Sequence, residues 1–348
     1  MVRSVRSVSI RLVAVIAAFM LLVPQAGGAE RSADRGSFEF ATPLFGIAIK
    51  RGDVYVADTG QGVVRYDPSS RTGSLIAPLP GVSDIALLRT GRMHAITGGP
   101  ESMLYRIFDG QVTPVADLGA FEAEVNPDGG EIDSNPFGVA ALRGRRALVA
   151  DAGANALLQV GRNGHVDWVA TLPSQLVPTR NAKRLAGCPD PEPDFAFVCD
   201  LPRRIPAEAV ATSVAVGPDG AYYVGELKGF PAPKHRSRVW RIEPGTRHAE
   251  CGSSPACTVV GRGFTSIVDL SFRPNGSLLV VEIDDASWLA VETGQATLGT
   301  VSSCDIASWE CDTVGRLPMP TAATSNRRHV FATTLALVPG AADVVKIA

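Results

Sequence analysis

The chain has 348 residues, with 33 Lys and Arg against 35 Asp and Glu, so its formal net charge is −2. Residues 178–184 and the pair Arg203 and Arg204 concentrate positive charge, and both stretches are too short to form a binding groove. A mildly acidic chain without a basic run argues against nucleic acid and anionic lipid as partners.

Residues 1–29 have the features of a secretory signal peptide. Arg3, Arg6 and Arg11 precede an apolar run over residues 12–23, and small residues over 26–29 provide a cleavage site. The alternative is an uncleaved membrane anchor, but this run is shorter than the roughly 20 residues of a spanning helix. We therefore expect a secreted, extracellular chain over residues 30–348, with no membrane attachment and a formal charge of −5 once the three Arg are removed.

One pattern recurs along the mature chain: an apolar strand, a turn that usually contains glycine, and a second β-rich strand that ends in an acidic or small residue. Its copies cover residues 46–58, 84–97, 138–151, 213–226 and 269–282, and a weaker copy begins at Thr334. Third strands are expected over residues 63–66, 103–107, 157–160 and 239–242. Such self-similarity is typical of repeat folds, whose units cannot bury their apolar faces alone.

These repeats predict an all-β fold, a six-bladed β-propeller in one domain over residues 30–348. Five or seven blades remain alternatives, because all but the first of the spacings between copies exceed the 40–45 residues that a blade needs. The last copy looks truncated, and residues 38–41 are expected to supply its outer strand, so that N- and C-terminal strands close the ring. The Pro-rich insertion around residues 173–211 is interpreted as a long surface loop.

All six cysteines lie in the second half of the chain, inside predicted loops, as three local pairs. An even number of Cys in an exported chain favours disulfides, although the sequence alone does not choose their connectivity. Zinc is the alternative, but no Cys or His cluster has the spacing of a zinc site. The simplest expectation is pairing within each local pair: Cys188 with Cys199, Cys251 with Cys257, and Cys304 with Cys311.

Two segments resemble the exported ScyD/ScyE family. They are residues 126–138, NPDGGEIDSNPFG, and residues 205–227, which run from IPAEAV to YYVGEL. That family is similar to six-bladed propellers of the NHL and TolB-like type. The resemblance therefore implies a six-bladed fold and export, and it implies little chemistry. This chain departs from the family pattern in its Cys-bearing insertions and in its shortened last blade.

Carboxylates recur at the ends of the second strands, where they are candidates for ligand binding. A ring of such groups suits a divalent cation or acid–base chemistry. The competing interpretation, which we favour, is that each one accepts hydrogen bonds from the backbone of the following turn. The residues are Asp58, Asp151, Glu226 and Glu282, with Thr97 interrupting the series.

Asp84 and Asp269 break the repeat symmetry and are therefore further candidates. They begin the innermost strands of the second and fifth blades, which face each other across a six-bladed ring. Two carboxylates in one channel can bind a cation or share a proton with a raised pKa. The structural alternative is that both hold water in the channel.

The loop over residues 126–135 is a candidate metal site. Glu131, Asp133 and Asn135 alternate along it, and Asp128 lies across the Gly129-Gly130 turn. Oxygen ligands of this kind suit Ca²⁺, although the EF-hand spacing is absent, and a solvated acidic loop is the competing interpretation. Glu208, in the second family-like segment, is expected on the same rim and is a ligand-binding candidate.

The sequence contains no G-x-S-x-G, H-E-x-x-H or Walker A motif. We therefore expect a secreted, monomeric binding module that holds a small molecule, glycan or protein at the channel mouth. The alternative is a lyase or hydrolase that uses a divalent metal on the channel carboxylates. An extracellular scaffold without a small-molecule site is the third interpretation.

Overall fold

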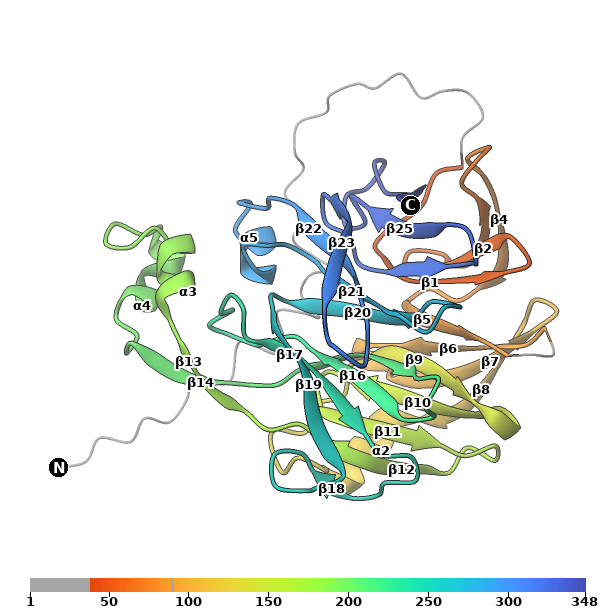
Figure 1. Cartoon of the computed structure of the whole chain (residues 1–348), viewed down its shortest axis with the longest axis horizontal. Coiled ribbons are helices and arrows are strands. Elements are labelled where there is room, and N and C mark those ends of the chain that lie inside the picture. The colour runs from red at the N-terminus through yellow and green to blue at the C-terminus, as the bar shows by residue number, and fades with distance from the viewer. Residues whose placement is uncertain (1–37, 89–90) are drawn as a thin grey trace.

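The computed structural model describes residues 38–88 and 91–348, so the predicted signal peptide lies outside the described residues. Six small antiparallel sheets are arranged as the blades of a β-propeller (Figure 1). The innermost strand of each blade contacts the innermost strand of the next, in the order β1, β5, β9, β15, β20, β24 and back to β1. The predicted fold is therefore confirmed, with six blades.

The first three blades have four strands each, joined by tight hairpins. Blade 1 contains β1 (Leu44–Lys50), β2 (Asp53–Asp58), β3 (Gly62–Asp67) and β4 (Thr72–Pro78). Blade 2 contains β5 (Val82–Leu87), β6 (Met93–Thr97), β7 (Met103–Phe108) and β8 (Gln111–Asp117). Blade 3 contains β9 (Pro136–Leu142), β10 (Arg146–Asp151), β11 (Ala156–Val160) and β12 (Val166–Thr171).

Blades 4 and 5 also have four strands, whereas blade 6 has three. Blade 4 contains β15 (Ala211–Val216), β16 (Tyr222–Glu226), β17 (Ser237–Ile242) and β19 (Cys257–Phe264); the short β18 (Ala249–Glu250) pairs in parallel with β12 of blade 3. Blade 5 contains β20 (Ile267–Phe272), β21 (Leu278–Glu282), β22 (Gly299–Cys304) and β23 (Cys311–Leu317). Blade 6 contains β24 (Ala323–Ser325), β25 (Val330–Thr334) and β26 (Asp343–Lys346).

Within residues 38–88 and 91–348, helices occur only in the connections. They are α2 (Leu118–Val125), α3 (Arg180–Leu185), α4 (Ala196–Cys199) and α5 (Trp288–Glu292), with short 3-10 turns η2 (Gly99–Glu101), η3 (Arg143–Arg145) and η4 (Pro193–Phe195). Within residues 38–88 and 91–348, no helix has the length and apolarity needed to cross a membrane.

Because the strands alternate in direction, the connections gather on two faces of the ring. We call the face with the first-to-second and third-to-fourth strand hairpins the turn face. The opposite face carries the second-to-third strand loops and the links between blades, and we call it the mouth face. Apolar side chains between neighbouring blades form the core; the cluster around Ile96, Leu104, Val149 and Leu158, for example, joins blades 2 and 3.

Blade 6 corrects two sequence-based expectations. Thr334 ends the second strand, β25, and does not begin an inner strand; the inner strand is the three-residue β24, which is too short to show an alternating pattern. Residues 38–41 form no strand. Instead the ring of Phe40 packs 4.9 Å from that of Tyr66, because burial of two aromatic rings favours the cleft between blades 1 and 6.

The ring closes between the N-terminal and C-terminal blades through side chains and backbone. The Leu44 amide donates to the Ala336 carbonyl at 2.9 Å, and the Tyr66 hydroxyl donates to Asp343 at 2.7 Å. A shared apolar cluster joins β1 and β3 to β26.

The insertion before blade 4 is more ordered than the predicted surface loop. Its β13 (Gln175–Pro178) and β14 (Arg204–Ala207) form a hairpin that carries α3 and α4. The disulfide between Cys188 and Cys199 joins the segment that follows α3 to the end of α4. The other two disulfides, Cys251–Cys257 and Cys304–Cys311, also follow the predicted local pairing, so all three are confirmed.

Candidate functional site

The connection between β21 and β22 places α5 over the axis of the ring on the mouth face. The Trp288 indole nitrogen donates to the Lys228 carbonyl at 2.8 Å, and the Trp288 amide donates to the Ser266 hydroxyl at 3.0 Å. Asn181 of α3 donates to the Ala286 carbonyl at 3.0 Å, so the insertion holds α5 from outside. Figure 1 shows α3 and α4 projecting on the same side of the ring as α5, and α3 contacts α5.

Beneath α5 the residues around the start of the inner strands enclose an apolar pocket of about 60 Å³. The rings of Phe45 and Phe137 pack 5.1 Å apart on one side of it. Its remaining walls come from four blades and from α5: Ala152, Thr212, Leu227, Val268, Ile283, Trp288, Glu292 and Leu337. The volume is about twice that of a liquid water molecule, so it suits a small apolar group rather than a whole ligand.

Glu292 is the one acidic side chain in the wall of this pocket. Its Oε1 atom is buried and has no hydrogen-bond partner within the described part of the chain. Burial raises the pKa of the carboxyl to about 8, because the charged form loses hydration among apolar side chains. At neutral pH the group is therefore largely protonated and able to donate a hydrogen bond.

Asp84 and Asp269 lie on the inner strands β5 and β20, and each one binds the next blade. Asp84 accepts from the Val139 amide at 2.7 Å, and Asp269 accepts from the Ala323 amide at 2.9 Å. Burial raises the pKa of Asp269 to about 7. Burial also raises the pKa of Asp84, and the charge of Asp269 adds to that rise. The charge of Asp269 thus disfavours ionisation of Asp84 across the channel.

Two of the second-strand carboxylates have the hydrogen bonds that the structural interpretation expects. Asp58 accepts from the Gly60 amide at 3.1 Å, and Asp151 accepts from the Gly153 amide at 3.1 Å. Both side chains are fully buried, and burial raises the pKa of Asp151 to about 6. Glu282 accepts from the Thr265 amide of the preceding connection, and burial raises its pKa to about 7.

Glu226 lies in a buried ion cluster at the end of β16. Its carboxylate accepts from Arg238 and from the Trp240 indole, and it pairs with Lys228 at 3.0 Å. Glu226 and Lys228 are almost completely buried. Because Arg238, Trp240 and Lys228 gather on this one carboxylate, the cluster joins the mouth-face loop to β17. The Lys228 Nζ atom makes no hydrogen bond within the described residues.

The acidic loop of residues 126–135 follows α2 on the mouth face, between two clefts of about 910 and 680 Å³. Asp128 accepts from the Gly130 amide and from the side chain of Asn155, and Asn135 accepts from the Gly99 amide. Burial raises the pKa of Asp133, and the charge of Glu131 adds to it.

Glu208 lines the second cleft, as expected for the same rim. Burial raises its pKa, and the charges of Asp128, Glu131 and Asp133 add to the rise, so the loop and Glu208 share one acidic field. Over residues 38–88 and 91–348, no group of three or more His, Cys, Asp or Glu side chains is arranged to hold a metal ion. The calcium site therefore remains a prediction.

Two notable carboxyls were not among the sequence-based candidates. Glu122 of α2 is buried, neither of its oxygens has a partner in the described chain, and burial with the charges of Asp151 and Asp128 raises its pKa to about 7. Glu292 is the other. The available signal for Glu292 was the long second-to-third strand connection of blade 5, which contains the apolar run of residues 288–291 directly before it.

No protein-family profile matches the sequence, and no curated protein sequence matches it. A structural genomics protein of unknown function from Bacteroides thetaiotaomicron is similar, at 11% identity and a TM-score of 0.56, over 89% of this chain and 70% of that one. The PQQ-bound aldose sugar dehydrogenase from Streptomyces coelicolor is similar at 12% identity and a TM-score of 0.53, over 90% and 96%.

Virginiamycin B lyase from Staphylococcus aureus is similar at 12% identity and a TM-score of 0.48, over 88% of this chain and 86% of the lyase. At such low identities a likeness speaks for the fold alone. The sheet order shows that the chain is a six-bladed β-propeller, and the likeness to the dehydrogenase structure agrees with this fold.

Proposed function

We propose that this protein binds a small molecule at the mouth of its propeller channel, as a secreted monomer of the ScyD/ScyE type. The observation that carries the proposal is the apolar pocket under α5, whose wall contains the Glu292 carboxyl with an unpartnered oxygen. Leaving a buried polar atom without a partner costs about 1–3 kcal/mol, which a ligand can recover.

The chemistry of the pocket defines the ligand class. A small apolar group fits among Phe45, Phe137 and Trp288. A protonated Glu292 donates a hydrogen bond to a carbonyl or ether oxygen beside that group, whereas an amine would instead favour the ionised carboxylate. Since the pocket holds about 60 Å³, the rest of the ligand extends past α5 toward solvent.

Two features support the export and family parts of this proposal. Three disulfides fit an extracellular protein, since such bonds persist in oxidising compartments. One family-like segment, residues 126–138, contains the acidic loop of the mouth face. The other, residues 205–227, carries Glu208 beside that loop and then continues into β15 and β16.

A thermal-shift screen tests the proposed site. Compounds that combine a small branched apolar group with a carbonyl or an amine are added to mature protein and to two variants, Glu292→Met and Glu124→Met, because Met keeps the length of the side chain and removes its hydrogen-bonding group. Glu124 is exposed on α2 and serves as the control. Binders should stabilise the protein and the Glu124 variant, and bind the Glu292 variant about tenfold less tightly. Equal binding by all three proteins would refute the site.

A second candidate function is a lyase or hydrolase reaction that uses a divalent metal at Asp84 and Asp269. It is favoured by one observation, the interaction of two buried carboxyls in a single channel. Elemental mass spectrometry of the mature protein, with a melting scan in EDTA, tests it. A stoichiometric metal that Asp84→Asn and Asp269→Asn abolish would support the enzyme, and metal-free protein indifferent to EDTA would exclude this mechanism.

A further inference from the structure

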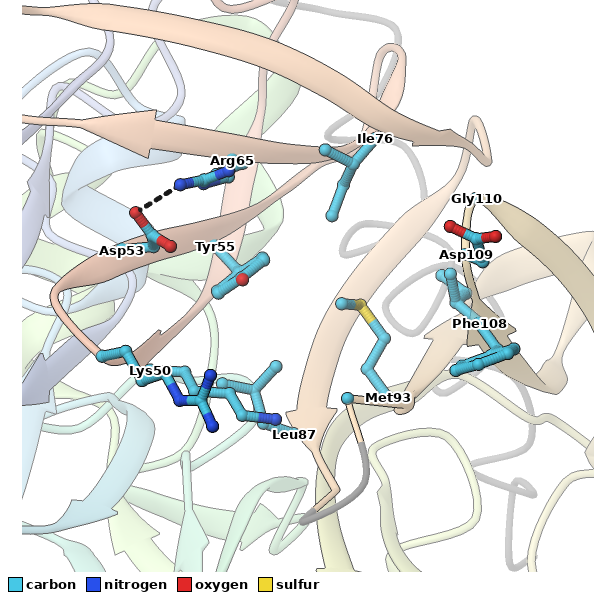
Figure 2. A pocket seen from close by; sticks show the side chains of 13 residues that line it. Lys50, Asp53, Tyr55, Arg65, Ile76, Leu87, Met93, Phe108, Asp109 and Gly110 are labelled. Atoms are coloured by element: carbon cyan, nitrogen blue, oxygen red, sulfur yellow. Dashed lines mark hydrogen bonds and ion pairs between the residues drawn. The ribbon is translucent and has the colours of Figure 1, made fainter.

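The turn face of blades 1 to 3 collects basic side chains that are scattered along the sequence. Between blades 1 and 2 it holds a groove of about 790 Å³ (Figure 2). Lys50 lies on one side of that groove, while Phe108 and Met93 lie on the other, and Arg51 also belongs to its lining. Arg65 also faces it, but pairs with Asp53 at 2.9 Å. This groove borders the hairpin turns of blade 2.

The strongest feature of this face lies one blade further on, around Arg106. The side chains of His94 on β6 and Arg106 on β7 are directly paired, so they lie on the same face of blade 2. Both nitrogens of His94, and Nε and Nη2 of Arg106, are buried without a hydrogen-bond partner within residues 38–88 and 91–348. Burial and the nearby Arg106 charge lower the pKa of His94 to about 4, so it is neutral.

Turns from blade 3 bring two more arginines to Arg106. Arg145 lies in the turn between β9 and β10, and Arg162 in the turn between β11 and β12, and both are exposed. The turn that contains Arg162 packs closely on β8 of blade 2. Its Gly164 approaches the backbone there so tightly that an added Cβ would lie 2.2 Å from the Val115 carbonyl oxygen.

Electrostatics agree with this packing. Burial lowers the pKa of Arg106, and the charges of Arg145, Arg92 and Arg162 lower it further. No salt bridge found in the described part of the chain includes Arg106, Arg145 or Arg162. Like charges held together around unpartnered guanidinium nitrogens favour a bound anion.

We propose that the turn face at the junction of blades 2 and 3 is an oxyanion site, in which Arg106, Arg145 and Arg162 bind a phosphate or sulfate group. Guanidinium groups present paired N–H donors that match the oxygens of such groups, and the bonds are charge-assisted. The neighbouring groove adds Lys50 and Arg51, alongside the acidic Asp109, so a polymer bearing repeated phosphate or sulfate esters would span both blade junctions.

The test compares anions of equal ionic strength. Mature protein is titrated with sodium phosphate, sodium sulfate and dextran sulfate, with chloride as the reference, and binding is measured by calorimetry. The variants are Arg106→Gln, the exposed Arg162→Gln, and Arg327→Gln as a control. Arg327 is exposed in the turn between β24 and β25, on the same face but in blade 6.

We expect sulfate and phosphate to bind the unchanged protein and the Arg327 variant, and to bind the Arg106 and Arg162 variants at least about tenfold more weakly. Arg162→Gln keeps the proposal testable if Arg106→Gln disturbs the fold. Much tighter binding of dextran sulfate would identify a polymer as the ligand, and equal affinity per charge would identify a free anion. Weak binding that all three variants retain equally would overturn the site.

Discussion

Replacing Glu292 by Gln should change how the stability of the protein depends on pH. The pKa of Glu292 is about 8 in the folded state, against an ordinary value of 4.5, and burial is the cause. Between these two pH values the folded protein keeps a proton that the unfolded chain has released. Rising pH therefore lowers the free energy of unfolding. The contribution of the protonated carboxyl to stability is complete only below pH 4.5, and it is lost as the pH rises to about 8.

The size of the effect follows from the two pKa values. Each pH unit between them lowers the free energy of unfolding by about 1.4 kcal/mol, which amounts to at most about 5 kcal/mol at pH 8. Partial contact of the carboxyl with solvent reduces this limit. Buried Asp269 and Glu282, with pKa values of about 7, act in the same direction, so only the difference between variant and parent isolates Glu292.

Urea unfolding of the disulfide-intact protein at pH 5 and pH 8 measures that difference. Glu292→Gln should change stability little at pH 5 and make the protein more stable than its parent by several kcal/mol at pH 8. Glu124→Gln, on an exposed side chain, should follow the parent at both pH values. A Glu292 variant whose stability relative to the parent is the same at pH 5 and pH 8 would refute the buried, protonated carboxyl.

Three further variants test the parts of the ring around this site. Asp84→Ala leaves the buried Val139 amide without its acceptor and should lower the free energy of unfolding by about 1–3 kcal/mol in urea titrations. Gly138→Ala places a Cβ 2.7 Å from a Cα atom of β15, so the melting temperature should fall, by an amount equivalent to at least about 1–3 kcal/mol; an unchanged melting temperature would contradict this close approach. Replacing Cys188 and Cys199 together by Ser should lower the free energy of unfolding in urea by up to about 3 kcal/mol, since the disulfide closes a loop of 11 residues. Full retention of stability would show that packing alone holds the insertion.

Repetition made most of the ring predictable from the sequence. Each of blades 1 to 5 repeats the same hairpin of an inner and a second strand, and that period survives the long insertions. Blade 6 was misplaced because β24 has only three residues, too few to show an alternation of apolar and polar side chains. Residues 38–41 were predicted to form a strand because Phe38 and Phe40 alternate with smaller or polar residues. In the structure the two rings instead pack beside Tyr66 at the junction of blades 1 and 6.

The candidate site was only partly predictable. Asp84 and Asp269 stood out because they break the repeat, and the structure brings their charges together across the ring. The pocket under α5 could not be predicted, since its wall combines residues from five blades with a helix in a loop. The arginines around Arg106 were missed for the same reason: a search for basic runs finds only residues that are adjacent in the sequence, and these meet through folding.

The most direct test of the channel-mouth proposal is a crystal structure of the mature protein with the most strongly stabilising compound from the screen. We expect an apolar group of that compound between Phe45, Phe137 and Trp288, and a hydrogen bond between the compound and the Glu292 carboxyl. Density for the compound in the clefts beside the acidic loop, with the pocket under α5 unchanged, would contradict it.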